Sequence, residues 1–225
     1  MEEPFFKPFV GKDYEEGIKG KRILVYGASF YCNKTGCEFF KDCTSPEKKD
    51  SSAYNTKCPE YAKKKDSMEL SNEPSYAIEE EYRAYKRFGE LMKLYVENKE
   101  EFIWDRMAFT DYVQFFLPIV QTKREFLSGR DFDAFKSVIV KLQPHIVVIW
   151  GLPVTEEVRD NRGKDMIPDW DKLPESEWYL CHMKIDDVPH LITLVCTYHP
   201  SSFTSWGADF EKLHKYMDIA LNEKV

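Results

Sequence analysis

Short apolar runs that stop at glycine or at polar residues recur along the chain and predict buried β-strands. Runs of this length, rich in Val and Ile, are typical of strands that are covered on both faces in a parallel sheet. The first run stops at Gly27, the second at Asp111 and the third at Gly151. The last two strands are joined by a predicted hairpin turn at Asp186 and Asp187. The five predicted strands span residues 23–26, 107–110, 145–151, 178–185 and 190–197.

Between these runs, apolar residues recur every three or four positions, which is the spacing of one helix face. The longest such stretch begins at Ser75 and continues to Tyr95. Residues 1–20 show no sustained period, and we expect them to form an N-terminal arm. Strands that alternate with helices predict a three-layer α/β/α sandwich with a central, mostly parallel sheet. Functional sites in such sheets form at the carboxyl ends of the strands. Shorter helices are predicted at residues 131–142, 155–159 and 208–222.

The composition fits one folded domain over residues 1–225. Hydrophobic residues make up 43% of the 225 residues, which excludes a disordered chain. The net charge of −7 excludes a protein that coats nucleic acid by bulk charge, so a nucleic-acid contact must be a local patch. Apolar runs stay well below the roughly 20 residues that cross a bilayer, and the N-terminus lacks the pattern of a signal peptide. We therefore expect a monomeric, cytoplasmic protein without membrane contact.

A Cys- and Lys-rich insertion occupies about residues 28–74 and shows no clear period. Structureless loops of this length are uncommon in compact domains unless they are functional or cross-linked. Four thiolates in one segment can hold a structural zinc ion, which we favour over an iron–sulfur cluster. Free thiols, with Cys32 lining a pocket, are the alternative. The four cysteines are Cys32, Cys37, Cys43 and Cys58.

The same insertion carries a local excess of basic residues. Between residues 33 and 65, eight lysines face five acidic residues. Lys63, Lys64 and Lys65 are candidates for contact with a phosphate backbone, and a solvated loop face is the alternative. DNA binding through a local basic and serine-rich surface is the resulting expectation.

Polar and aromatic side chains follow the predicted parallel strands. An aromatic loop follows the first strand, a carboxylate ends the second, and a histidine motif follows the last. Because the carboxyl ends of parallel strands meet at one edge of a sheet, we expect these residues to form a pocket. Tyr31 and Phe109 would line this pocket, with Ser29, Asp111 and His199 as its polar members.

These motifs resemble the uracil-DNA glycosylase superfamily over residues 21–206. Members carry a Gly-led motif with a Tyr after the first strand, an Asn at the end of a middle strand and a His-Pro-Ser loop near the end. Gly27 and Tyr31 match the first motif, and the run from His199 to Ser201 matches the last. The resemblance implies a uracil-DNA glycosylase-like fold. It also implies hydrolysis of the N-glycosidic bond of a deaminated or damaged base in DNA, with no cofactor required for catalysis.

The resemblance further assigns roles to individual residues. His199 would donate a hydrogen bond to the base oxygen on which negative charge develops. Tyr31 would exclude the methyl group of thymine, and Asp111 would read the edge of the base. Phe30 or Phe109 would stack on the flipped base. Phosphate contacts and the wedge that replaces the flipped base would come from Ser201, Ser202 and Phe203.

Two residues depart from the family pattern. Ser29 stands where the most active relatives have an Asp or Asn that positions water, so Ser29 would at most help to hold water. Asp111 stands in place of the Asn. A carboxylate repels the O4 acceptor of uracil unless it is protonated, and it would instead accept from an exocyclic amine. A non-catalytic relative that binds nucleic acid or a nucleobase is therefore one alternative function.

The second alternative is an esterase of the GDSL/SGNH type. The run that ends at Ser29 resembles the opening block of those hydrolases, in which a Ser is the nucleophile. Their closing Asp-x-x-His pattern matches the run from Asp187 to His190. Ser29, His190 and Asp187 would then form a catalytic triad. Ala28 stands in place of the Asp that precedes the nucleophile in that family.

Overall fold

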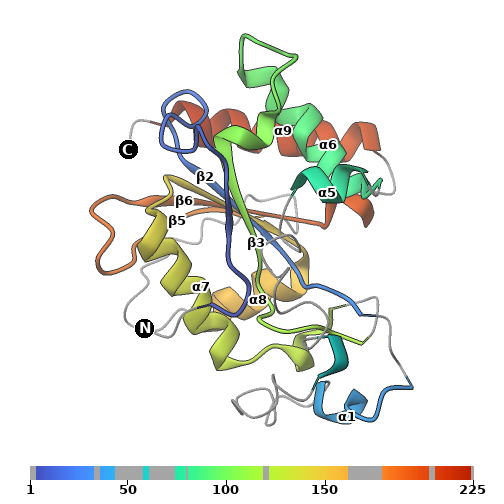
Figure 1. Cartoon of the computed structure of the whole chain (residues 1–225). Coiled ribbons are helices and arrows are strands. Elements are labelled where there is room, and N and C mark those ends of the chain that lie inside the picture. Colours follow the sequence, from blue (N-terminus) through green and yellow to red (C-terminus); the bar gives the residue numbers. More distant parts are fainter. Residues whose placement is uncertain are drawn as a thin grey trace.

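Four parallel strands form the centre of a six-stranded mixed sheet, and one antiparallel strand lies at each edge (Figure 1). The order across the sheet is β1-β3-β2-β4-β6-β5. The strands are β1 (Phe9–Val10), β2 (Ile23–Gly27), β3 (Met107–Asp111), β4 (Ile146–Trp150), β5 (Tyr179–Met183) and β6 (Ile192–Thr197). The computed structural model describes residues 4–32, 36–43, 58–60, 74–79, 81–118, 122–161, 179–202 and 206–223.

The burial of the central strands explains their apolar sequences. Every residue of β2, β3, β4 and β6 is buried, as expected for strands that are covered on both faces. The register aligns their carboxyl ends, because Gly27 pairs with Asp111 and Trp150 pairs with Thr197. The predicted α/β class, the four central strands and the antiparallel β5–β6 hairpin are confirmed.

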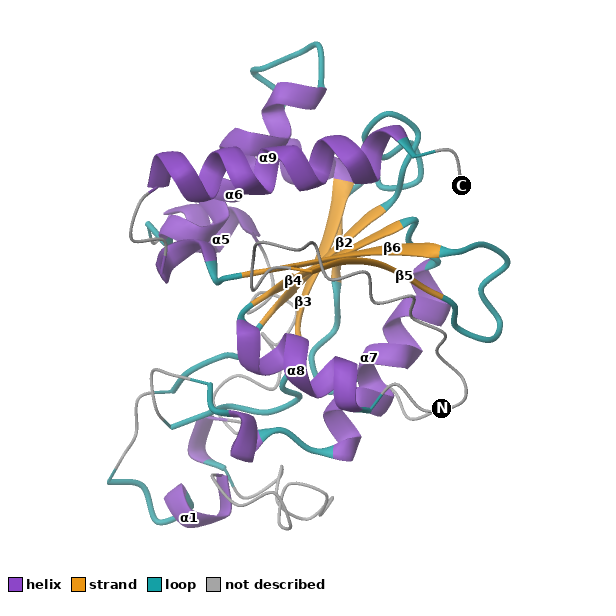
Figure 2. Cartoon of the chain, turned by 180° about the vertical axis from the view of Figure 1, so that it is seen from behind, coloured by secondary structure: helices purple, strands orange, loops and turns teal. Residues whose placement is uncertain are grey.

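Helices cover both faces of the sheet, so the protein has three layers (Figure 2). α5, α6 and α9 lie on one face, and α7 and α8 lie on the other. The helices are α1 (Phe40–Cys43), α5 (Pro74–Glu79), α6 (Arg83–Met92), α7 (Gly129–Leu142), α8 (Leu152–Asp160) and α9 (Trp206–Asn222). Short 3-10 helices are η2 (Lys93–Tyr95), η3 (Ile103–Arg106), η4 (Arg124–Phe126) and η5 (Pro200–Ser202). Within the part of the chain that the structure describes, none of the helices has the length and apolarity needed to cross a membrane.

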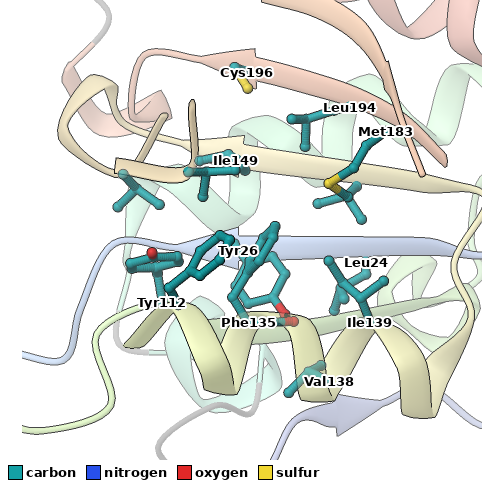
Figure 3. Close-up of a cluster of buried hydrophobic side chains, with 14 of the residues drawn as sticks. Leu24, Tyr26, Tyr112, Phe135, Val138, Ile139, Ile149, Met183, Leu194 and Cys196 are labelled. Atoms are coloured by element: carbon teal, nitrogen blue, oxygen red, sulfur yellow. Dashed lines mark hydrogen bonds between the residues drawn. The ribbon is translucent and has the colours of Figure 1, made fainter. Parts of the chain in front are cut away.

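The face covered by α7 and α8 carries a continuous apolar core (Figure 3). The ring of Phe135 packs against two tyrosines, with centroids 4.8 Å from Tyr26 and 5.7 Å from Tyr112. The Tyr26 hydroxyl donates a hydrogen bond to the Phe135 carbonyl oxygen at 3.0 Å, so this buried polar group is satisfied. These contacts hold α7 on β2, the strand whose carboxyl end carries the first predicted motif.

The stretch predicted as one helix from Ser75 to Tyr95 is two helices. Glu81 has a φ of 61°, in the left-handed region, and this residue separates α5 from α6. The backbone N–H of Tyr82 donates to the carbonyl oxygen of Ala77 at 2.9 Å, as at many helix ends. Apolar residues keep their helical spacing on both sides of the break, so hydrophobic periodicity alone does not reveal it.

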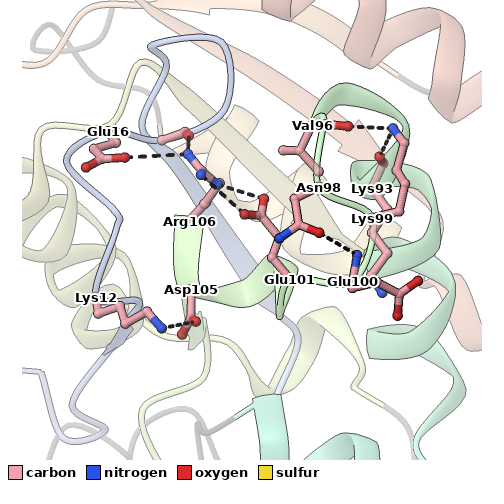
Figure 4. Close-up of polar contacts among 11 residues, drawn as sticks. Lys12, Glu16, Lys93, Val96, Asn98, Lys99, Glu100, Glu101, Asp105 and Arg106 are labelled. Atoms are coloured by element: carbon pink, nitrogen blue, oxygen red, sulfur yellow. Dashed lines mark hydrogen bonds and ion pairs between the residues drawn. The ribbon is translucent and has the colours of Figure 1, made fainter.

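The N-terminal arm contains a strand that the pattern did not predict. β1 pairs antiparallel with β3 and is the outermost strand on that side of the sheet. At the amino end of β3, Arg106 forms an ion pair with Glu101 at 2.8 Å and donates to the Gly17 carbonyl oxygen at 3.2 Å (Figure 4). These contacts tie the N-terminal segment to the amino-terminal end of β3, which is the end of the sheet opposite the candidate site.

Candidate functional site

The last residues of the four parallel strands lie in one row. Gly27 pairs with Asp111 and Trp150 pairs with Thr197, and the neighbouring strands β2 and β4 bring the two pairs side by side. Side chains alternate along a strand, so Asp111 shares the face of Phe109, which packs toward α6. The structure therefore brings together Gly27, Phe109 and Asp111, which are predicted site residues, and it adds Trp150 to them.

Gly27 makes room for the Asp111 carboxyl group. A Cβ atom at position 27 would overlap Oδ1 of Asp111 and would lie 2.7 Å from Cζ of Phe109. Only a residue without a side chain lets the carboxyl group lie against the end of β2. The Gly that the first motif contains thus has a steric reason to be there.

The Asp111 carboxyl group is a buried acid. The residue is 6% exposed, and within the described part of the chain no hydrogen bond is donated to its carboxyl oxygens. Its backbone oxygen does accept a hydrogen bond, from Nε2 of Gln114 at 2.8 Å. Burial raises the pKa of Asp111 from 3.8 to about 7, because the charged form loses its hydration. Asp111 therefore exchanges its proton near neutral pH.

Aromatic rings adjoin Asp111 on the α6 side. The Tyr85 ring lies 4.9 Å from Phe109 and 5.5 Å from Trp150, measured between centroids. Phe109 is only 1% exposed, so it supports the site from the core and offers no free face to a base in this structure. Burial and the nearby Asp111 charge raise the pKa of Tyr85 well above its ordinary value. The sequence placed Tyr85 on a helix face, but only the packing of α6 brings it to the site.

His199 lies at the same edge, against Trp150. The two rings meet edge to face at 5.7 Å and 78°. The Ser201 N–H donates to Nδ1 of His199 at 3.3 Å, and the Ser201 hydroxyl lies 2.6 Å from the same nitrogen. Because a backbone N–H can only donate, Nδ1 is the acceptor and the neutral ring carries its proton on Nε2. Burial lowers the pKa of His199 to about 4, so the imidazole is neutral at physiological pH.

The loop that carries His199 is fixed from α6. Nη1 of Arg87 donates to the carbonyl oxygen of Pro200 at 2.7 Å, across 113 residues of sequence. Sequence reasoning missed Arg87, since nothing local distinguishes it from other basic residues on a helix. Ser201 orients the imidazole, and its contact with a phosphate stays a prediction.

Tyr31 and Ser29 form a hydroxyl cluster with Thr122, a second residue that the sequence did not single out. Oγ1 of Thr122 lies 2.7 Å from the Tyr31 hydroxyl and 2.5 Å from Oγ of Ser29. The Thr122 N–H also donates to the Tyr31 hydroxyl at 3.1 Å. Tyr31 packs against the core on the α7 face, whereas His199 packs against Trp150 on the α6 face. The two side chains thus lie on opposite faces of the sheet near the carboxyl ends of its strands. No contact among the described residues brings them together in the predicted pocket.

Phe30 lies apart from this row. Its ring packs 5.2 Å from Phe116 and 6.3 Å from Phe6, in a phenylalanine cluster that contains neither Asp111 nor His199. Phe30 is thus a packing residue here, and the prediction that it stacks on a base finds no support in its position. Ser202 belongs to η5, but its side chain is not described. Outside the described residues lie Phe203, Lys63, Lys64 and Lys65.

The triad expected for an esterase is not assembled. Ser29 follows the carboxyl end of β2, whereas His190 stacks on His145 at 4.5 Å, directly before β4. Because β2 and β4 run parallel, the length of the sheet separates Ser29 from His190. Nε2 of His190 lies 3.0 Å from the carbonyl oxygen of Pro144, and Asp187 has a φ of 68° in the turn between β5 and β6. This placement excludes catalysis by a Ser29–His190 pair.

Three of the four insertion cysteines lie in one cluster. Cys43 and Cys58 are buried there, and Cys32 packs against the same group, while Cys37 is half-buried outside it. Among the residues with described positions, no group of three or more His, Cys, Asp or Glu side chains is arranged to hold a metal ion. The structural zinc site stays a prediction, which metal analysis of the purified protein would test.

The sequence matches no protein-family model, and no curated protein matches it at a significant level. Function must therefore be inferred from the chemistry of the site. Two groups define that chemistry: a neutral imidazole at His199, whose Nε2–H donates to no described residue, and a buried acid at Asp111. Both lie at the edge of the sheet where α/β proteins bind their ligands.

Proposed function

We propose that the protein is a DNA glycosylase that hydrolyses the N-glycosidic bond of a deaminated or damaged base, with a uracil-DNA glycosylase-like fold. The observation that carries the proposal is His199, a neutral imidazole whose Nε2–H makes no hydrogen bond to any described residue. Further support comes from the position of Gly27, Asp111 and His199 at one edge of the parallel sheet.

In the proposed reaction, His199 stabilises the departing base. Cleavage of the bond leaves an oxocarbenium-like sugar and an anionic base. A fixed donor aimed at the oxygen that gains charge lowers the barrier, because it needs no reorganisation during the reaction. Ser201 fixes the imidazole tautomer, and Arg87 fixes the loop, so the donor is held in place before the base arrives.

Two further residues would select the base. The Tyr31 ring, held through its hydroxyl by Thr122, would limit the space beside C5 of a pyrimidine and so exclude thymine. Because Tyr31 packs on the α7 face and His199 on the α6 face, this role requires a base that lies across the carboxyl ends of the strands. Asp111 would read the edge of the base. Ser29 would at most help to hold water, since its hydroxyl is already bound to Thr122 at 2.5 Å.

A non-catalytic protein that binds a nucleobase or nucleic acid is the second candidate. The observation that favours it is the Ser29 hydroxyl, whose described hydrogen bond goes to another hydroxyl and not to a basic group. A serine in this state is a poor activator of water. Such a protein would bind the base at the same edge of the sheet and release no product.

The test is an oligonucleotide panel with uracil, hypoxanthine or xanthine at one position, in single-stranded and duplex form. We expect release of the free base, detected as strand cleavage at the abasic site after alkali. The His199→Ala variant should be about 10² to 10³ times slower, as for loss of one transition-state donor. Asp133→Asn, which changes an exposed acid on α7, is the matched control and should keep wild-type activity. Tight binding without release of any base would support the second candidate, and full activity of His199→Ala would refute the role of that residue.

A further inference from the structure

The end of β3, where the proposed function places the reading of the base, holds a buried acid. The carboxyl group of Asp111 lies against Gly27, and no described residue donates a hydrogen bond to it. Among the described residues, a carboxylate here would find neither a cation nor a hydrogen-bond donor, so burial disfavours its charged form. The protonated acid carries no charge and still offers polar atoms to a ligand.

We propose that Asp111 works as a neutral carboxylic acid that donates a hydrogen bond to a base with a ring N–H beside a carbonyl oxygen. This inference rests on the function proposed above and specifies the class of base. The C=O of the acid accepts from the ring N–H, and its O–H donates to the base carbonyl. Uracil, hypoxanthine and xanthine all present such a lactam edge. An ionised Asp111 has no donor and repels the carbonyl oxygen of the base.

The described groups that pack around Asp111 and His199 keep their charge state while Asp111 titrates. Gly27 of β2 and Trp150 of β4 carry no titratable group, and Tyr85 of α6 has a pKa raised well above its ordinary value. His199, beyond Trp150, has a pKa lowered to about 4 and stays neutral. Burial is the cause that raises the pKa of Asp111 to about 7. Of these groups, Asp111 alone changes charge between about pH 5.5 and 8.5.

The first test compares pH profiles of kcat/KM for the wild type, Asp111→Asn and the exposed-acid control Asp133→Asn on a uracil-containing single strand. Wild type and control should be constant below about pH 6.5 and fall about tenfold per pH unit well above pH 7. Asp111→Asn should give a flat profile, because a carboxamide keeps one donor and one acceptor at every pH. A flat wild-type profile would overturn the proposal. So would activity that rises with pH on a cytosine-containing strand, since that indicates a carboxylate accepting from an exocyclic amine.

The second test separates recognition from hydrolysis. A single strand with 2′-fluoro-2′-deoxyuridine resists cleavage, and its Kd can be followed by fluorescence anisotropy at about pH 6 and 8.5. The wild type should bind it at least about tenfold more weakly at the higher pH, and Asp111→Asn should bind it equally at both. If this pattern appears without base release, the hydrolysis proposal fails and the inference about Asp111 stands. If uracil is released with no such pH dependence, hydrolysis stands and the inference fails.

Discussion

Replacing Asp111 with Asn should make the protein more stable, and the gain should grow with pH. The unfolded chain ionises Asp111 near its ordinary pKa of 3.8, whereas the folded protein keeps the proton up to about pH 7. Between these values the folded state holds one more proton than the unfolded state, so stability falls as pH rises. The Asn side chain stays neutral at every pH and avoids this loss.

The magnitude follows from the width of that interval. Each pH unit in which only the folded state holds the proton amounts to about 1.4 kcal/mol. The interval from 3.8 to about 7 therefore corresponds to about 4 kcal/mol in the free energy of unfolding. The full difference should be present above about pH 7, and almost none of it below about pH 4.

Urea unfolding followed by tryptophan fluorescence, at about pH 4.5, 6, 7 and 8, measures this difference for wild type and Asp111→Asn. A stability difference that stays the same across the series would refute the reasoning, because it would mean that folding does not shift the pKa of Asp111. Asp131→Asn is the matched control, a second buried acid. Asp131 accepts hydrogen bonds from the Ser128 N–H and hydroxyl and from the Gln114 N–H. We expect Asp131→Asn to be about 1–3 kcal/mol less stable than the wild type at pH 7.

Three further substitutions test the packing of the site. Gly27→Ala places a methyl group on the Asp111 carboxyl, so we expect a loss of about 1–3 kcal/mol and a lower Tm, and an unchanged Tm would contradict this packing. Thr122→Val removes the hydroxyl partner of Tyr31 and should lower the free energy of unfolding by about 1 kcal/mol in urea, whereas no loss would mean that the hydroxyl cluster does not form. Ser128→Ala removes the hydroxyl contacts of the α7 capping box and should lower the same quantity by about 1 kcal/mol, with thermal unfolding as the measurement and an unaltered curve as the refuting result.

Much of the site's framework could be predicted from the sequence because buried strands have continuous apolar sequences. β2, β3, β4 and β6 are covered on both faces, so each is a continuous apolar run that stops where the chain reaches the edge of the sheet. The residues at those stops, Gly27, Asp111 and His199, are the residues that the structure places at one edge. The break between α5 and α6 at Glu81 could not be predicted in this way, because the helical spacing of apolar residues continues on both sides of it.

What the tertiary structure alone decided are the contacts between distant segments. Arg87 meets Pro200 across 113 residues, and Thr122 meets Tyr31 across 91, and neither pair shares a local pattern. The charge state of Asp111 also belongs to the fold, because the chain itself provides an ordinary carboxyl group. Only its burial against Gly27 raises the pKa to about 7. Sequence periodicity records which face of an element is buried, whereas the identity of the neighbour on that face depends on strand order and helix packing.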